Sequence, residues 1–291
     1  MDELGIIEFR LLSLSGEGSM NISNEILEKY IKDAMEKMDD DHRSLIKDKA
    51  DKHTLEVLEN PQFKRIIKYT ENIRNDFINT LRIISVYSTR TPYYEDSLTI
   101  FMIDELIESM VGISVLIREG MHNICRRELR YLLELAVKLT IVDMKKKELS
   151  LNDKVLYLKS DVPNSSIDYI DEICLPFKTD ENKQFTDEVK DIYKKLCAYV
   201  HPSKKQIHER LNNYKKGVTI GFESFDMLEK LSRELFRIYD IILVLMLNGF
   251  GKDMSGDLFV NAFEPYNKWK FHKGKYTKMY SKLFNYKYEC Q

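Results

Sequence analysis

Apolar residues recur at intervals of three and four positions along most of this chain, which is the spacing of helices that pack one face against a core. In the first such segment the recurring residues are Ile66, Ile67, Ile73, Phe77, Leu81 and Ile84. Two later segments, 98–117 and 223–250, are apolar on most faces and predict buried helices. The pattern predicts an all-α protein whose centre is an antiparallel helical bundle over about 61–250.

The stretch before the bundle has a different pattern. Residues 23–60 predict one long helix, charged nearly all round, that ends at an Asn-Pro break. A run of charges is usually a solvated face, but the same helix is the candidate surface for a partner protein. The chain therefore divides into a charged helical arm at 1–60, the bundle at 61–250 and a C-terminal segment at 251–291.

Composition agrees with helices and narrows the function. The 291 residues are 43% hydrophobic and 32% charged, with 11 Gly and 6 Pro, so the chain can bury a core beneath a well-solvated surface. The net charge of −2 excludes a protein that binds polyanions over its whole surface. Any contact with RNA must come from a local basic patch.

The remaining sequence features predict a cytoplasmic protein without membrane spans, metals or cofactors. The four cysteines are scattered, which is typical of reduced thiols and not of a disulfide framework or zinc module. The longest apolar run, 241–247, is too short to cross a bilayer, and the acidic start lacks the basic residues of a signal peptide. No nucleotide-binding or metalloprotease motif is present.

Basic residues border the apolar face of the helix predicted at 121–149. That face consists of Cys125, Leu129, Leu132, Leu133, Ala136 and Thr140. Arg126, Arg127, Arg130 and Glu134 lie beside it. One interpretation is an ordinary i,i+4 ion pair between Arg130 and Glu134, and the other is a group of guanidiniums that clamps a phosphate.

A second candidate group surrounds His201, at the end of the helix predicted for 184–201. Pro202 disfavours helical backbone at His201, and Ser203 can cap a following helix, so the segment can be a structural joint. A histidine at a helix end is also suited to act as a general acid or base near neutral pH. The residues alone leave both interpretations open.

Together these two segments resemble a bacterial branch of the HEPN superfamily, the helical domains of toxins, abortive-infection proteins and other antiviral systems. Members carry an R-x-x-x-E-like pair on one core helix and a Y-x-x-L-[small]-x-x-[VT]-H-[PS] ending on another. The matching residues here are Arg130, Glu134, Tyr193, Leu196, Cys197, Val200, His201 and Ser203. The resemblance covers about residues 95–250 and implies a HEPN-like bundle.

Many HEPN domains are metal-independent ribonucleases that act as homodimers with an R-x(4–6)-H motif. The resemblance therefore implies His201 as the general acid or base and a homodimer as the active form. Here Lys194 and Lys195 stand where the motif has arginine, and lysine lacks the bidentate fork. Either Arg130, oriented by Glu134, replaces it, or the protein is a non-catalytic helical interaction or antitoxin-like subunit.

The C-terminal segment interleaves lysines with aromatic residues. The candidate RNA-binding residues in it are Lys268, Trp269, Lys270, Lys273 and Lys275. Lysines attract phosphate and aromatic rings stack on unpaired bases, so a free tail would bind single-stranded RNA. The alternative is a terminal segment whose rings pack on the bundle while its lysines stay in water.

Overall fold

The computed structural model describes residues 24–89, 95–162, 167–200, 203–215, 225–263 and 268–284. Within these ranges every regular element is a helix and none is a strand, which confirms the predicted all-α class. The chain falls into two units, residues 1–55 and 56–291. None of the helices in the described ranges has both the length and the apolar character needed to span a lipid bilayer.

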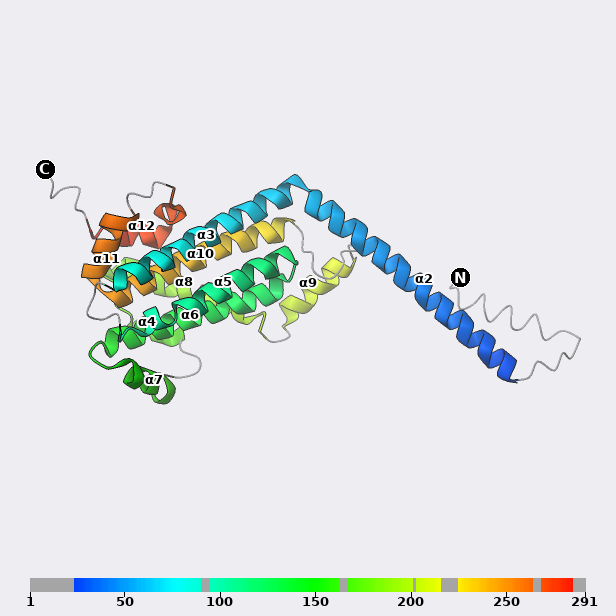
Figure 1. Ribbon diagram of the computed structural model, residues 1–291, viewed down its shortest axis with the longest axis horizontal. Coiled ribbons are helices and arrows are strands. Elements are labelled where there is room, and N and C mark those ends of the chain that lie inside the picture. The colour runs from blue at the N-terminus through cyan, green and yellow to red at the C-terminus, as the bar shows by residue number, and fades with distance from the viewer. Residues whose placement is uncertain are drawn as a thin grey trace, which may run out of the picture. The chain divides into compact units, whose positions relative to one another are not determined.

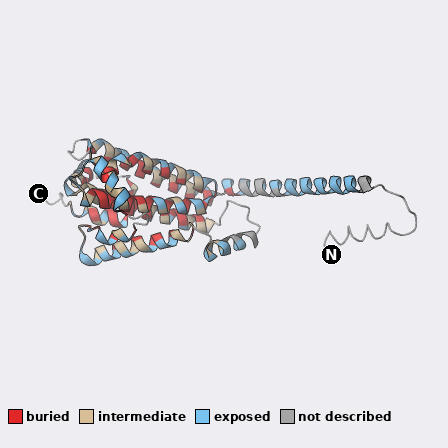
Figure 2. Cartoon of the chain, turned by 90° about the horizontal axis from the view of Figure 1, so that it is seen from below, coloured by how far each residue is buried: buried red, intermediate tan, exposed pale blue. Residues whose placement is uncertain are grey.

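The predicted charged helix is present as α2, Asn24–Glu59. Its described side chains before residue 56 are exposed, and charged residues are frequent among them (Figure 2). At its end Asn60 accepts hydrogen bonds from the backbone N–H groups of Gln62 and Phe63 and so caps the next helix. Pro61 occupies the first turn of that helix, where its missing N–H costs nothing.

Four long helices make the centre of the second unit. They are α3 (Pro61–Ser88), α5 (Ile103–Arg118), α6 (His122–Lys145) and α10 (Phe225–Phe250). Helix α10 packs against α3 and α6, and α5 also packs against α3 and α6 (Figure 1). Buried positions lie on the sides of these helices that face one another (Figure 2). The predicted apolar face of α6 is wholly buried, from Cys125 to Thr140.

The segment predicted as one buried helix at 98–117 is two helices. A short helix α4 (Leu98–Phe101) ends at Met102, and α5 begins at Ile103. Asp143 of α6 accepts hydrogen bonds from the backbone N–H groups of Leu98 and Thr99 and holds the start of α4. The prediction that this segment is buried on most faces is also wrong, since Phe101 is 64% exposed and other apolar residues of α5 face outward.

The other strongly apolar segment behaves as predicted. In α10 every residue from Ile238 to Leu247 is buried, and all but Asp240 are apolar. The apolar side chains of this stretch are therefore buried within the bundle. Residues 238–247 leave no apolar face exposed to a second copy. A homodimer is expected to bury part of the two strongly apolar segments, 98–117 and 223–250, against a second copy. Among the described side chains of these segments, large exposed apolar residues lie only in the first, at Phe101, Val111 and Val115.

Smaller elements cover the sides of the bundle. They are α7 (Leu151–Ser160), η1 (Ile167–Glu172), α8 (Thr179–Cys197) and α9 (Lys204–Lys215). Helix α8 packs along α6, and its residues Phe185, Val189 and Leu196 are buried. This contact brings the two segments that carry the HEPN resemblance side by side.

The C-terminal residues in the described ranges are packed on the bundle. After α10 come α11 (Lys252–Leu258), the π-turn η2 (Phe259–Phe263), the 3₁₀ turn η3 (Lys270–Lys273) and α12 (Lys275–Ser281). Helix α12 contacts α10, and η3 contacts α3 (Figure 1). Of the two alternatives for this segment, the packed one holds for its described part, residues 268–284.

Candidate functional site

Arg130, Glu134 and Tyr193 form a polar cluster where α6 meets α8. The guanidinium of Arg130 donates a hydrogen bond to Tyr193 Oη at 2.7 Å, and Tyr193 donates to Glu134 Oε2 at 3.3 Å. The predicted ion pair is also present, with 3.4 Å between Arg130 Nη2 and Glu134 Oε2. Lys138 completes the charge balance of Glu134 at 3.5 Å. Three residues of the HEPN-like pattern are therefore in direct contact.

The guanidinium of Arg130 is firmly cationic in this cluster. Burial opposes its charge, but the hydrogen bond and the electrostatic interactions with Tyr193, Cys197 and Glu134 more than offset it and raise the pKa of Arg130. Its Nε is buried without a hydrogen-bond partner among the described residues. A buried donor without a partner is uncommon, and it is a place where an acceptor is needed.

A second contact fixes the turn that follows α8. The helix ends at Cys197, four residues earlier than the predicted end at His201, and the chain continues as tight turns through Val200. Arg127 Nε donates a hydrogen bond to the carbonyl of Tyr199. The guanidinium of Arg126 lies over the Tyr199 ring, 4.6 Å from its centroid. Two α6 arginines thus hold the chain just before the HPS motif.

His201 and Pro202 lie outside the described residues. On the far side, Ser203 Oγ accepts a hydrogen bond from the backbone N–H of Gln206 and caps α9, as the sequence predicts. The structure therefore supports the helix joint at Ser203, and the general acid or base role of His201 stays a prediction.

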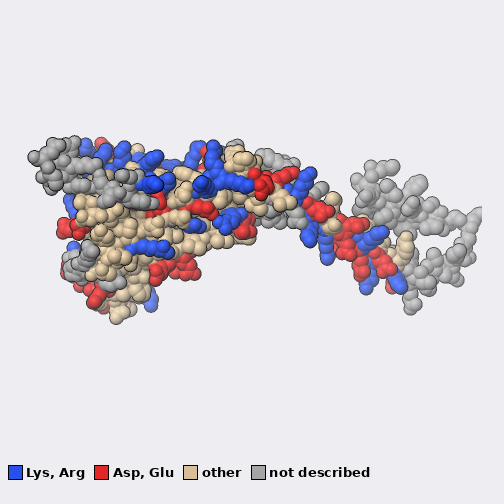
Figure 3. Space-filling model, turned by 45° about the horizontal axis from the view of Figure 1, so that its top comes forward, with Lys and Arg blue, Asp and Glu red and all other residues tan. Residues whose placement is uncertain are grey.

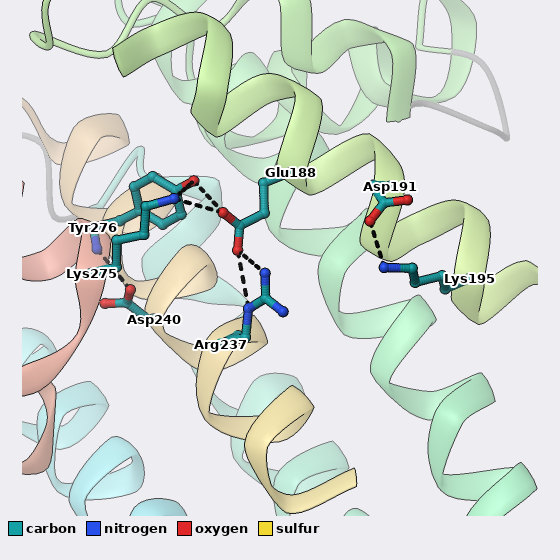
Figure 4. A network of polar contacts seen from close by, with 7 residues as sticks. All are labelled: Glu188, Asp191, Lys195, Arg237, Asp240, Lys275 and Tyr276. Atoms are coloured by element: carbon teal, nitrogen blue, oxygen red, sulfur yellow. Dashed lines mark hydrogen bonds and ion pairs between the residues drawn. The ribbon is translucent and has the colours of Figure 1, made fainter. Parts of the chain in front are cut away.

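The two lysines predicted as catalytic are both exposed on α8. Lys195 donates to Asp191, one turn earlier on the same helix, at 2.6 Å (Figure 4). Lys194 has no ion-pair partner in the described part of the chain. Lys194 and Lys195 were expected to stabilise one phosphate together with Arg130. Neither lysine contacts Arg130 within the described structure.

A pocket of about 250 Å³ opens beside this junction, between α6, α8, α9 and α10. Its cationic lining residues are Arg126, Lys195, Lys205, Lys230 and Arg237. The pocket also has two carboxylates, Glu209 and Glu234, and an apolar wall that includes Ile192, Leu196 and Ile238. Two residues singled out in the sequence, Arg126 and Lys195, therefore face one cavity.

The pocket cations differ in how they are held. Arg237 donates to Glu188, and Figure 4 shows these two side chains pointing toward one another between α10 and α8. Lys205 lies over the Tyr199 ring, 5.0 Å from its centroid. Lys230 is exposed and has no ion-pair partner in the described ranges. Basic and acidic side chains are interspersed over the face of this unit that Figure 3 shows.

Tyr199 forms a buried part of the pocket wall. It is 4% exposed, and burial raises the pKa of its hydroxyl although Arg126 and Lys205 oppose the shift. The protonated hydroxyl donates to Glu209 Oε1 at 3.1 Å. The other oxygen of that carboxylate, Oε2, is buried without a partner among the described residues.

The predicted RNA-binding residues of the C-terminal segment do not form a stacking platform. Trp269 is 3% exposed and stacks on Phe263, so its ring faces the core and not solvent. Lys275 is held by Glu188 at 2.8 Å. Lys268 and Lys273 are exposed, but no exposed aromatic ring accompanies them in the described ranges. The prediction of base stacking on Trp269 is wrong for this packing.

Sequence reasoning missed Lys205, Lys230, Arg237 and Tyr199. Lys205 lies within the KK that follows the HPS motif, but nothing in the sequence places it against a residue of α10. The ranges described contain no group of three or more His, Cys, Asp or Glu residues arranged to hold a metal ion. Comparison with protein-family models, with curated proteins and with solved structures finds no match to this chain.

Proposed function

We propose that this protein is a HEPN-like, metal-independent endoribonuclease that acts on RNA in bacterial anti-phage defence or as the toxin of a toxin–antitoxin pair. The observation that carries the proposal is the hydrogen bond between Arg130 and Tyr193, 63 positions apart in sequence. It joins the two segments on which the resemblance rests. That contact is what a shared site requires, and independent helices of a generic bundle would not need it.

The proposed chemistry uses His201 as the general acid or base at a ribose 2′-hydroxyl or at the leaving oxygen. Arg130 stabilises the negative charge that develops on the phosphate, and Glu134 with Tyr193 orients its guanidinium. The partnerless Nε of Arg130 supports this role, because a phosphate oxygen is an acceptor for it. Lys194 and Lys195 contribute positive charge near the same helix end.

Cleavage of total RNA and of tRNA in the presence of EDTA tests this function. We expect cleavage by the wild-type chain and its loss in His201→Ala. His208→Ala is the matched control, since His208 is an exposed histidine on the following helix, α9, and its loss should leave cleavage intact. Arg130→Lys should lower the rate while keeping the charge, because lysine cannot form the bidentate fork.

Two results contradict the proposal. One is the absence of cleavage by a folded wild-type chain with every RNA tried. The other is equal cleavage by the wild-type and His201→Ala chains, which would trace the activity to a contaminant or another site. Circular dichroism melts of each variant show whether a loss of cleavage reflects chemistry or unfolding.

Homodimerisation is part of the proposed function, because HEPN-like sites are completed by a second copy. The exposed apolar side chains that support it lie on α4, α5 and the start of α6: Phe101, Val111, Val115, Met121 and Ile124. Light scattering at micromolar concentration should give twice the 34.5 kDa of one chain. If the mass is that of one chain and cleavage is intact, the site is not shared between two copies, and the ribonuclease proposal still stands.

A second candidate is a non-catalytic protein that binds a partner through α2. The observation in its favour is the exposure of large apolar residues on this charged helix, with Tyr30 at 74% and Met35 at 66%. Ile31, Met38 and Leu45 recur every seven residues and are also exposed, which is the spacing of a helix–helix seam. If this candidate is right, Met35→Glu combined with Met38→Glu should abolish partner binding in a pull-down, and His201→Ala should leave that binding unchanged.

A further inference from the structure

The pocket beside Tyr199 contains Lys205, Lys230 and Glu209, which the proposed cleavage reaction does not use. Its walls come from four helices, and its volume of about 250 Å³ is slightly below the range of roughly 300–1,000 Å³ that holds a drug-sized ligand. It therefore suits a small ligand or the terminal unit of a longer one. The chemistry of the lining residues indicates the chemical class of that ligand.

The pocket cations without a carboxylate partner indicate an anionic group. Lys205 and Lys230 both line it, and no carboxylate pairs with either of them among the described residues. Arg237 is already held by Glu188, and Lys195 by Asp191, so these two shape the wall. Two lysine ammonium groups that reach one cavity from α9 and α10 suit a phosphate, which is compact and dianionic.

The buried carboxylate of the pocket indicates a hydrogen-bond donor on the same ligand. Glu209 uses Oε1 to accept from Tyr199, and its Oε2 is buried without a partner within the described structure. A buried acceptor of this kind is stabilised by a hydroxyl or N–H donor on the ligand. A sugar hydroxyl supplies that donor.

We propose that this pocket binds a ribose phosphate monoester, with the phosphate on Lys205 and Lys230 and a sugar hydroxyl on Glu209. The apolar residues Ile192, Leu196 and Ile238 then face the uncharged part of the ligand. The same group occurs in a free nucleotide and at the phosphorylated end of an RNA chain. This site is separate from the Arg130 cluster and does not require that the protein cleave RNA.

Isothermal titration calorimetry with the full chain tests the proposal and distinguishes the two sources. The probes are adenosine monophosphate, adenosine, a short RNA with a 5′-phosphate and the same RNA with a 5′-hydroxyl. We expect each phosphorylated probe that binds to bind roughly tenfold or more tightly than its unphosphorylated counterpart, because charged hydrogen bonds are lost with the phosphate. Binding of the mononucleotide alone identifies a free nucleotide, and preference for the 5′-phosphorylated RNA identifies a chain end.

Variants tie the binding to this pocket. Lys205→Ala combined with Lys230→Ala should weaken the phosphorylated probe by roughly tenfold or more. Lys159→Ala, an exposed lysine on α7 outside the pocket, is the control and should change nothing. Glu209→Gln should weaken the binding of adenosine monophosphate but not that of sulfate, since only the former offers a hydroxyl. Equal binding of adenosine and its monophosphate, or unchanged binding by the double lysine variant, overturns the proposal whether or not RNA is cleaved.

Discussion

The indole Nε1–H of Trp269 donates a hydrogen bond to Thr80 Oγ1 at 2.8 Å, across 189 positions of sequence. The next residue continues this attachment, because the backbone N–H of Lys270 donates to Asp76 Oδ2 at 2.8 Å. Both acceptors belong to α3. The C-terminal segment is thus fastened to the bundle through polar groups that a free tail would leave in water.

Trp269→Ala should therefore act on stability. The substitution removes a large buried ring and leaves a cavity beside Phe263, so we expect a loss of about 3–5 kcal/mol in the free energy of unfolding. Urea denaturation measures it. Lys268→Ala, at the exposed neighbouring position, should change stability by less than about 0.5 kcal/mol. If the Trp269→Ala chain kept its stability and bound RNA more weakly, the result would contradict the packed ring and support base stacking on Trp269.

Asp143→Ala should also destabilise the bundle. The carboxylate of Asp143 accepts from Lys154 Nζ at 3.0 Å and from donors at the start of α4, and both partners of the ion pair are almost completely buried. Removing it leaves a buried ammonium without its counter-charge, which costs about 3–5 kcal/mol. Glu172→Ala breaks the exposed pair with Lys145 and is the control, with an expected cost below about 1 kcal/mol. Equal effects of the two substitutions in urea denaturation would contradict this account.

The same ion pair shows where sequence reasoning ends. Helical periodicity predicted α2, α3, α6 and α10 to within a few residues, because each depends on local spacing and caps. The start of α4 is held in part by Asp143, a residue of another helix, and periodicity did not predict the break at Met102. A local sequence pattern cannot predict a helix cap whose capping residue is 45 positions away in the sequence.

The candidate site divides in the same way. Arg130 and Glu134 are one turn apart, so their ion pair followed from the sequence. The contact of Arg130 with Tyr193 came from a resemblance and not from spacing. The pocket lysines could not be predicted, because Lys205 of α9 and Lys230 of α10 line one pocket only in the folded chain.

Acid should weaken the attachment of α12 through Glu188. Although burial alone would raise the pKa of Glu188, hydrogen bonds from Lys275, Tyr276 and Arg237 lower it from its usual 4.5 to about 2 (Figure 4). Because the folded-state pKa is depressed, this contribution to stability is fully present above pH 4.5 and is lost as the pH falls toward 2.

Denaturation series at several pH values test this dependence. Glu188→Gln removes the titrating group, so its stability should fall less steeply than the wild type between pH 4.5 and 2. Above pH 5 the variant should be the less stable chain, since the ion pairs with Arg237 and Lys275 are gone. Asp191→Asn, which breaks only the exposed pair with Lys195, is the control and should keep the acid slope of the wild type. Parallel acid slopes for Glu188→Gln and the wild type would exclude Glu188 as the source.

Gly274→Ala should disrupt the start of α12 for steric reasons. The carboxylate of Asp240 caps this helix by accepting from the backbone N–H groups of Tyr276 and Thr277 at 2.8 and 3.0 Å. A Cβ added at Gly274 would lie 2.1 Å from Asp240 Oδ1, so the cap must break or the segment must move. Losing a helix cap costs about 0.5–2 kcal/mol, and displacement of the packed segment adds to it.

Gly112→Ala is the matched comparison, because both substitutions add one methyl group to a glycine of the same unit. A Cβ at Gly112 has no atom within 4 Å, and this glycine lies inside α5, where alanine is the better helix former. We expect Gly112→Ala to gain about 0.5–1 kcal/mol and Gly274→Ala to lose stability in the same thermal or urea measurement. Since the two changes are chemically identical, opposite signs would isolate the close approach of Asp240 as the cause, and a stabilising effect at both positions would contradict the packing of α12 against α10.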